Sequence, residues 1–246
     1  MKDNIMFLWS GVVNKDSLIY NCILSLRENI KECNIFVVTP DLDKDSIRLL
    51  EEFKVKVFKF PLKDFTNRRM VCKIEKICEL LENNIPEDGN LLVCDGDVVF
   101  CKNPFNVFHN NFDFLYTTRH IKDWIATNGG VIGFKNNQKS RNFINFFIEQ
   151  IHNPTWTPYV NFRLNHPHNR NIKNIDWWVD QDFTHCINSN KESVNNGGLG
   201  FDIVVFDAGS EYNYITSGLN REQIQELIKS KNKYIVHLKG GGIVRW

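Results

Sequence analysis

Short apolar, β-branched runs alternate with amphipathic stretches through the first hundred residues of this 246-residue chain. Strands are predicted at residues 5–13, 35–41 and 55–61, and helices at 17–29, 43–53 and 68–83. Strands and helices that alternate at these intervals predict βαβ units, and therefore an α/β fold whose mostly parallel, twisted sheet is flanked by helices. A sheet of this kind binds ligands beyond the carboxyl ends of its strands.

The second half of the chain is less regular. It predicts strands at 112–118, 129–134, 201–207 and 234–238 and helices at 140–152 and 221–231, with Ser140 as the N-cap of the first helix. Residues 153–178 form a long connection rich in asparagine, proline, histidine and aromatic residues. Because no repeat, low-complexity tract or linker interrupts the chain, we expect a single domain over residues 1–246.

Composition argues against several kinds of site and partner. The net charge of +1 offers no basic surface for a polyanion, so nucleic acid is not an expected partner. The N-terminal apolar run is far shorter than the ~20 residues of a membrane-spanning helix and lacks a signal-peptide cleavage pattern, so we expect no membrane span and a cytoplasmic location. Seven cysteines without a CxxC pair are expected to be reduced core thiols and not zinc ligands.

The tripeptide Asp-x-Asp occurs four times, but only one occurrence has the context of a ligand site. The pairs are Asp41/Asp43, Asp43/Asp45, Asp95/Asp97 and Asp180/Asp182. The first two pairs enter a predicted helix, where acidic side chains suit the N-terminus. Asp95 and Asp97 instead follow four apolar residues, with Gly96 between them to let the backbone approach a ligand closely.

Two carboxylates together with the oxygen atoms of a diphosphate form a site suited to Mg²⁺ or Mn²⁺. His237 ends another apolar strand and opens into glycines, and an imidazole ligand would favour Mn²⁺. From the sequence alone, a structural role for His237 is the alternative.

Four motifs occur in the order found in a known enzyme family: DGD at 95–97, TNGGVIGF at 127–134, DQD at 180–182 and HLKGGG at 237–242. Over essentially its whole length, the chain therefore resembles the nucleotide-sugar glycosyltransferases of the GT-A fold. It is most similar to glycosyltransferase family 8, which includes glycogenin and bacterial lipooligosaccharide galactosyltransferases. The resemblance implies a nucleotide-binding half at about residues 1–100 and a half for the donor sugar and acceptor at about 101–246.

The resemblance also assigns residues to a metal ion and to the donor. Asp95, Asp97 and His237 match the family's ligands for Mn²⁺ or Mg²⁺. The implied donor contacts are Trp9, Ser10 and Gly11 at the nucleotide base, Arg69 and Lys73 in the helix before the DGD strand, Asp95 near the ribose with Gly96 beside it, and Asn128 and Gly129 along the sugar.

The C-terminal motif departs from the family pattern. Family members have a lysine six residues after the histidine, in a tail that clamps the pyrophosphate, whereas this chain has Ile243 there. Lys239 and Arg245, with Gly240, are the nearby residues expected to supply this donor contact. Trp246 ends the chain where the family's tail has its tryptophan. Because the family's usual extension beyond this point is lacking, we expect either a minimal enzyme or one domain of a longer protein.

Asp180, Gln181 and Asp182 are the expected catalytic residues, because the family's DQD lies beside the anomeric carbon. An oxygen atom of these side chains could stabilise the positive charge that the sugar develops. The resemblance implies retention of the anomeric configuration, and inversion with Asp180 or Asp182 as general base is the alternative. A non-catalytic alternative is that the tripeptide caps a helix beginning at Phe183.

The aromatic residues of the long connection suit a carbohydrate acceptor, because flat rings contact the apolar faces of sugars. The expected acceptor contacts are Trp156, Tyr159, Trp177 and Trp178, with a plain packed loop as the alternative. Together these features predict metal-dependent transfer of a sugar from a nucleotide diphosphate donor, expected to be UDP-linked, to a carbohydrate acceptor. The alternatives from other classes are a haloacid dehalogenase-type phosphatase, which also uses Asp-x-Asp after a buried strand, and a non-catalytic glycan-binding module.

Overall fold

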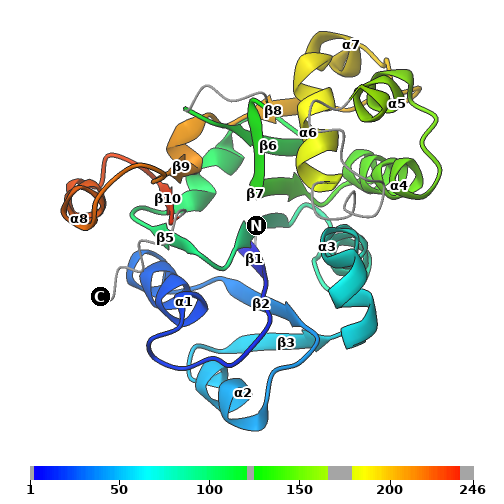
Figure 1. The fold of residues 1–246 in the computed structure, drawn as a ribbon. Coiled ribbons are helices and arrows are strands. Elements are labelled where there is room, and N and C mark those ends of the chain that lie inside the picture. The colour runs from blue at the N-terminus through cyan, green and yellow to red at the C-terminus, as the bar shows by residue number, and fades with distance from the viewer. Residues whose placement is uncertain (1–2, 121–124, 166–178, 239–246) are drawn as a thin grey trace.

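A seven-stranded sheet of order β3-β2-β1-β4-β7-β6-β8 forms the centre of the molecule (Figure 1). The structure, a computed structural model, describes residues 3–120, 125–165 and 179–238, apart from the side chains of 62–67. The first elements are β1 (Asp3–Leu8), α1 (Leu18–Asn29), β2 (Asn34–Thr39), α2 (Lys44–Glu51), β3 (Val55–Lys59), α3 (Leu62–Asn83) and β4 (Asn90–Asp95). β1 pairs in parallel with β2 and β4, and β2 with β3, so the predicted α/β class with a mostly parallel sheet is confirmed.

The first strand is shorter than the predicted 5–13. β1 ends at Leu8, and the chain then turns through Gly11, whose φ of +90° favours glycine. The amide of Gly11 donates to the Asp41 carboxylate at 3.1 Å, which holds this turn beside the end of β2. The apolar residues after the turn belong to a loop, in which Val12 is 63% exposed and Val13 is buried.

The second half completes the large sheet and adds a small one. Its elements are β5 (Val98–Phe100), η1 (Pro104–His109), β6 (Phe114–Thr118), β7 (Thr127–Lys135), α4 (Gln138–His152), α5 (Thr157–Leu164), α6 (Val179–Ser189), α7 (Lys191–Asn195), β8 (Val205–Asp207), η3 (Ser210–Tyr212), β9 (Tyr214–Ile215), α8 (Arg221–Ser230) and β10 (Ile235–His237). β7 runs antiparallel to both β4 and β6. The small sheet has the order β5-β10-β9, so the chain changes sheets between β4 and β5.

Two predictions and one alternative for the second half are wrong in detail. The N-cap of α4 is Asn137 and not Ser140, because the Asn137 side chain accepts a hydrogen bond from the Ser140 amide. The connection at 153–178 is not irregular throughout, since α5 lies within it. The DQD tripeptide does not cap a helix beginning at Phe183, because α6 already includes Val179 and carries the three residues in its first turn.

Apolar side chains cover both faces of the large sheet. Along β1, Ile5 and Phe7 face one core and Met6 and Leu8 face the other, as the two-residue period of a strand requires. The first core includes buried residues of α1, and the second includes buried residues of α3, α4 and α6. Figure 1 shows these three helices together along one side of the sheet.

The structure bears on two expectations from composition, which concern membrane-spanning helices and the state of the cysteines. Within the described ranges, no helix offers the length and apolar character that crossing a bilayer requires. All seven cysteines are free thiols, and every one except Cys33 is buried, which agrees with the predicted role as core residues.

Phe183 is expected to contribute strongly to stability, because its ring is fully buried and stacks on Phe147 at a centroid distance of 3.8 Å. Replacing it with alanine (Phe183→Ala) should lower the free energy of unfolding by about 3–5 kcal/mol, measured by urea denaturation. Leu164→Ala is the control, since Leu164 is 78% exposed and should change the free energy little. Equal losses in the two variants would contradict this account of the core.

Candidate functional site

Three candidate metal ligands converge where β4 ends. Asp95 is the last residue of β4, Asp97 lies in the turn that follows, and His237 ends β10. β10 runs antiparallel to β5, and the amide of Leu238 donates to the Asp97 carbonyl at 2.9 Å. This pairing brings one potential ligand atom from each of the three residues within 4.8 Å of the other two.

The imidazole of His237 is fully buried, whereas the two carboxylates are partly exposed. Its Nε2 lies 3.0 Å from Asp97 Oδ1 and 3.7 Å from Asp95 Oδ2, yet it has no hydrogen-bond partner among the described residues. A buried nitrogen without a partner, facing two carboxylates, fits a divalent cation. Two carboxylates and one imidazole are a ligand set suited to Mn²⁺, and the carboxylates alone suit Mg²⁺.

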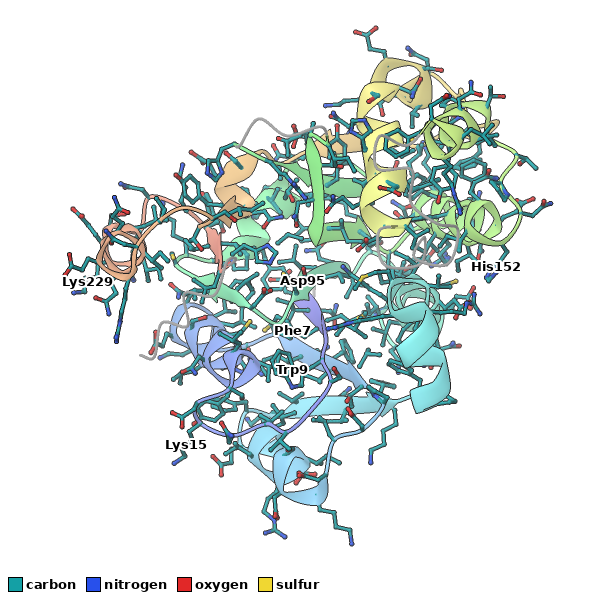
Figure 2. All side chains as sticks on the ribbon, viewed as in Figure 1. Phe7, Trp9, Lys15, Asp95, His152 and Lys229 are labelled. Carbon is teal, nitrogen blue, oxygen red and sulfur yellow. The ribbon has the colours of Figure 1, made fainter. Side chains whose placement is uncertain are left out.

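A cavity of about 250 Å³ opens beside the two carboxylates. Its lining residues are Leu8, Trp9, Leu18, Arg69, Met70, Asp95, Gly96 and Asp97. Trp9 lies directly over Gly96, where a Cβ atom would come within 2.7 Å of the ring, and Figure 2 shows Trp9 and Asp95 near the middle of the molecule. The indole Nε1 is buried without a hydrogen-bond partner among the described residues, so a ligand could accept from it.

Arg69 brings positive charge to the same cavity. Burial lowers the pKa of its guanidinium, and the neighbouring charges of Asp95 and Asp97 oppose that shift. Because an arginine remains protonated in proteins, the cavity combines an aromatic ring, a cation and two carboxylates.

Lys73 joins the site to the helices that cover it. Its buried ammonium donates to the Gly129 carbonyl at 2.7 Å, to Asp180 Oδ2 at 2.9 Å and to Asp95 Oδ1 at 3.5 Å. Burial acts to lower the pKa of Lys73, but the charges of Asp180 and Asp95 outweigh it, so the pKa is raised above its ordinary value of 10.5. The ammonium therefore stays charged and fixes both carboxylates relative to β7.

Two glycines of β7 leave the space that these side chains fill. A Cβ atom at Gly129 would lie 2.4 Å from Asp180 Oδ2, and one at Gly130 would lie 2.4 Å from His237 Cε1. Neither position tolerates a larger residue without displacing a side chain of the site. The NGG of the TNGGVIGF motif is therefore needed for the approach of Asp180 and His237.

The other two residues of the DQD tripeptide, Gln181 and Asp182, are also buried. Arg119, which follows β6, donates from Nη2 to Gln181 Oε1 at 2.9 Å. Because a guanidinium only donates, the amide oxygen of Gln181 must face Arg119. The structure thus brings Asp180 together with Lys73 and Asp95, and Gln181 together with Arg119.

The expected acceptor residues have a different outcome. Trp156 is half-buried, and its ring packs against Phe146 and Phe183. Tyr159 is fully buried, with its ring edge-on to Phe183, so it is a core residue and not an exposed platform for a sugar. Five predicted site residues lie outside the described part of the chain, namely Trp177, Trp178, Lys239, Gly240 and Arg245.

Sequence reasoning missed two residues of the site. Arg119 follows the carboxyl end of a strand, a position that could have identified it as a candidate. Asn213, whose Oδ1 lies 2.9 Å from His237 Nδ1, is in an irregular stretch that has no periodicity or motif to single it out. Of the residues that were predicted, Ser10 and Gly11 lie in the loop after Trp9, and Asn128 is buried in β7.

The chain is similar to known proteins in both sequence and fold. The profile of the nucleotide-diphospho-sugar transferase family matches residues 34–242. No curated protein matches the chain. Among solved structures, mouse xyloside xylosyltransferase 1 is similar with a TM-score of 0.62 and 13% identity, covering 98% of this chain and 99% of that one.

Two further structures share the fold. The galactosyltransferase LgtC, solved with donor and acceptor sugar analogues, has a TM-score of 0.54 and 13% identity over 97% of this chain and 87% of its own. A glycosyltransferase involved in the glycosylation of the major capsid of PBCV-1 has a TM-score of 0.55 and 12% identity over 99% of this chain and 95% of its own. The predicted GT-A fold is thereby confirmed.

Removal of the buried ammonium should destabilise the protein, because Asp180 would be left buried without its cationic partner. Lys73→Met is expected to lower the free energy of unfolding by roughly 3–5 kcal/mol at neutral pH. Since the pKa of Lys73 is raised on folding, its contribution should be fully present below pH 10.5 and be lost as the pH rises through the raised value. Urea denaturation of parent and variant over this range measures the difference, and a gap that widens with alkaline pH would contradict the assignment.

The close approach at Gly129 can be tested with a matched glycine of the same strand. Gly129→Ala should lower the free energy of unfolding by about 1–3 kcal/mol, because the added methyl group meets the Asp180 carboxylate. In Gly133→Ala the nearest atom is the ring edge of Phe108 at 3.2 Å, so a smaller loss is expected. Thermal and urea unfolding provide the comparison, and an equal or larger loss for Gly133→Ala would count against a specific role of Gly129.

Proposed function

Because the chain belongs to the nucleotide-diphospho-sugar transferase family, we propose that it is a metal-dependent glycosyltransferase that moves a sugar from a UDP-linked donor to a carbohydrate acceptor. Family membership makes the chain a glycosyltransferase and leaves the phosphatase interpretation without support. Similarity to LgtC supports, within this proposal, a relationship to glycosyltransferase family 8.

The observation that carries the proposal is the juxtaposition of a possible metal site and a cavity. Asp95, Asp97 and His237 present their ligand atoms within 4.8 Å of one another, and both carboxylates also line the cavity of about 250 Å³. A diphosphate bound in this cavity would meet the same cation that the three side chains hold. Mn²⁺, or alternatively Mg²⁺, is the proposed ion.

When bound, the ion would neutralise negative charge that develops on the phosphate oxygen atoms of the leaving nucleotide. Arg69 adds a second positive charge at the cavity wall. Trp9 provides a ring face for the nucleotide base and an indole N–H that has no hydrogen-bond partner among the described residues. These groups together suit a donor that is aromatic at one end and anionic at the other.

The ion pair between Lys73 and Asp180 limits the role that the Asp180 carboxylate can have in the reaction. Asp180 accepts a hydrogen bond from Lys73 through Oδ2 and from the backbone amide of Gln181 through Oδ1, so both of its carboxylate oxygen atoms already have a partner. This arrangement suits a carboxylate that holds its position beside the sugar better than one that takes a proton from an acceptor. We therefore propose retention of the anomeric configuration, and the configuration of the product distinguishes it from inversion with Asp180 or Asp182 as base.

A thermal-shift screen of nucleotide sugars, with and without Mn²⁺, tests the function. The parent should be stabilised by a UDP-sugar only when Mn²⁺ is present, by about 2.7 kcal/mol when the ligand is at a hundred times its Kd. Asp97→Ala should lose this metal-dependent shift, because it removes one ligand of the cation.

Asp45→Ala is the matched control, since Asp45 belongs to another Asp-x-Asp tripeptide but lies exposed in the first turn of α2. It should keep the shift of the parent. Equal shifts in the parent and Asp97→Ala would refute the metal assignment. Binding of UDP-sugars without transfer to any acceptor would favour the non-catalytic glycan-binding module.

A further inference from the structure

We infer that Asn213 is a positioning residue that holds His237 in the tautomer required of a metal ligand. This inference rests on the proposed metal site and adds to it the residue that prepares one ligand. Asn213 is almost completely buried and lies between η3 and β9, far along the chain from Asp95 and Asp97. Its side chain makes three polar contacts, and each one reaches a different strand.

The three contacts use both the oxygen and the nitrogen of the side-chain amide. Asn213 Oδ1 lies 2.9 Å from His237 Nδ1 on β10. Asn213 Nδ2 donates to Thr117 Oγ1 on β6 at 2.9 Å and to Asn128 Oδ1 on β7 at 3.1 Å. Thr117 in turn donates to the Val131 carbonyl at 3.1 Å, so its lone pairs are available to Asn213.

The direction of these hydrogen bonds is fixed by a backbone amide. The N–H of Gly130 can only donate, and it donates to Asn128 Oδ1 at 2.7 Å. An oxygen atom therefore faces Asn213, which must present its Nδ2 to Asn128 and its Oδ1 to His237. Because Oδ1 only accepts, Nδ1 of His237 must carry the proton.

The proton on Nδ1 determines what His237 presents to the two carboxylates. In the neutral imidazole, Nε2 then has a lone pair, which is the form that binds a metal ion. This lone pair faces Asp95 and Asp97, so all three side chains can donate to one cation between them. Residues that hydrogen-bond a ligating histidine and fix its tautomer in this way typically contribute a factor of about 10–100 to metal affinity.

Mn²⁺ affinity of the full chain, measured by electron paramagnetic resonance titration without nucleotide, tests the inference. Asn213→Ala should weaken Mn²⁺ binding by about 10–100-fold, because the imidazole loses the acceptor that fixes its tautomer. Asn213→Asp should keep most of the affinity, since a carboxylate oxygen still accepts from Nδ1. If Asn213 only linked the strands through Nδ2, both variants should lose Mn²⁺ affinity equally, because neither retains that donor.

The double variant Asn213→Ala/His237→Ala completes a cycle. If Asn213 acts through His237, its removal should have no further effect on Mn²⁺ affinity once His237 is absent. Asn220→Ala is a control for a nearby asparagine, because Asn220 caps α8 and should affect stability without changing Mn²⁺ affinity.

A nitrogen-15 NMR spectrum of the histidine side chains gives a direct readout even if Asn213→Ala does not fold. The His237 signal, identified by its absence in His237→Ala, should show a proton on Nδ1 in the parent. A His237 signal without a proton on Nδ1 would overturn the inference.

The outcomes separate the two levels of the proposal. If His237→Ala binds Mn²⁺ as the parent does, the metal site of the proposed function fails, and the inference fails with it. If His237→Ala binds weakly but Asn213→Ala binds as the parent does, the metal site stands and only the role of Asn213 is refuted.

Discussion

The buried ammonium of Lys73 needs oxygen atoms around it, and each one that it finds comes from a different element. Asp95 ends β4, Gly129 lies in β7 and Asp180 lies in the first turn of α6. A charge taken out of water at this depth is tolerated only when its partners are in place. The contacts of one side chain on α3 therefore set how β4, β7 and α6 meet, and the cavity and the three candidate ligands lie at that junction.

Small residues make this junction possible. Gly129 and Gly130 leave room for Asp180 and His237, and Gly96 leaves room for the ring of Trp9. The site is therefore built by close packing as much as by its charged groups. This explains why the glycines of the NGG and DGD motifs are as informative as their polar neighbours.

The sequence predicted what depends on local pattern. Alternating strands and helices and the buried strand before Asp95 were accessible from the pattern of residues. The convergence of Asp97 with His237 was expected mainly from the family resemblance, because the pairing of β5 with β10 that brings them together is a tertiary contact. The end of β1 could not be predicted, since Val12 and Val13 have the residue types of a strand until the turn at Gly11 is known. Tyr159 was wrongly expected to contact the acceptor, because the sequence around an aromatic residue in a polar stretch does not distinguish a ring that faces a sugar from one that packs in the core.

Asn213 shows a different limit. Its importance lies in hydrogen bonds to residues 24, 85 and 96 positions away, and no spacing in the sequence encodes such partners. Arg119 is similar, since its contact with Gln181 spans 62 positions. Residues that orient other residues are determined by tertiary structure, so they emerge only when the side chains are placed.

The change of sheet between Asp95 and Asp97 has a mechanical consequence. Asp95 belongs to the seven-stranded sheet, and His237 belongs to the three-stranded sheet, to which Asp97 leads. A cation held by all three side chains would add a non-covalent cross-link between two sheets that already share a hydrophobic core through Phe7 and Phe100. Ion binding and the docking of the small sheet would then be one coupled equilibrium, in which the stability of β5, β9 and β10 follows the concentration of free metal.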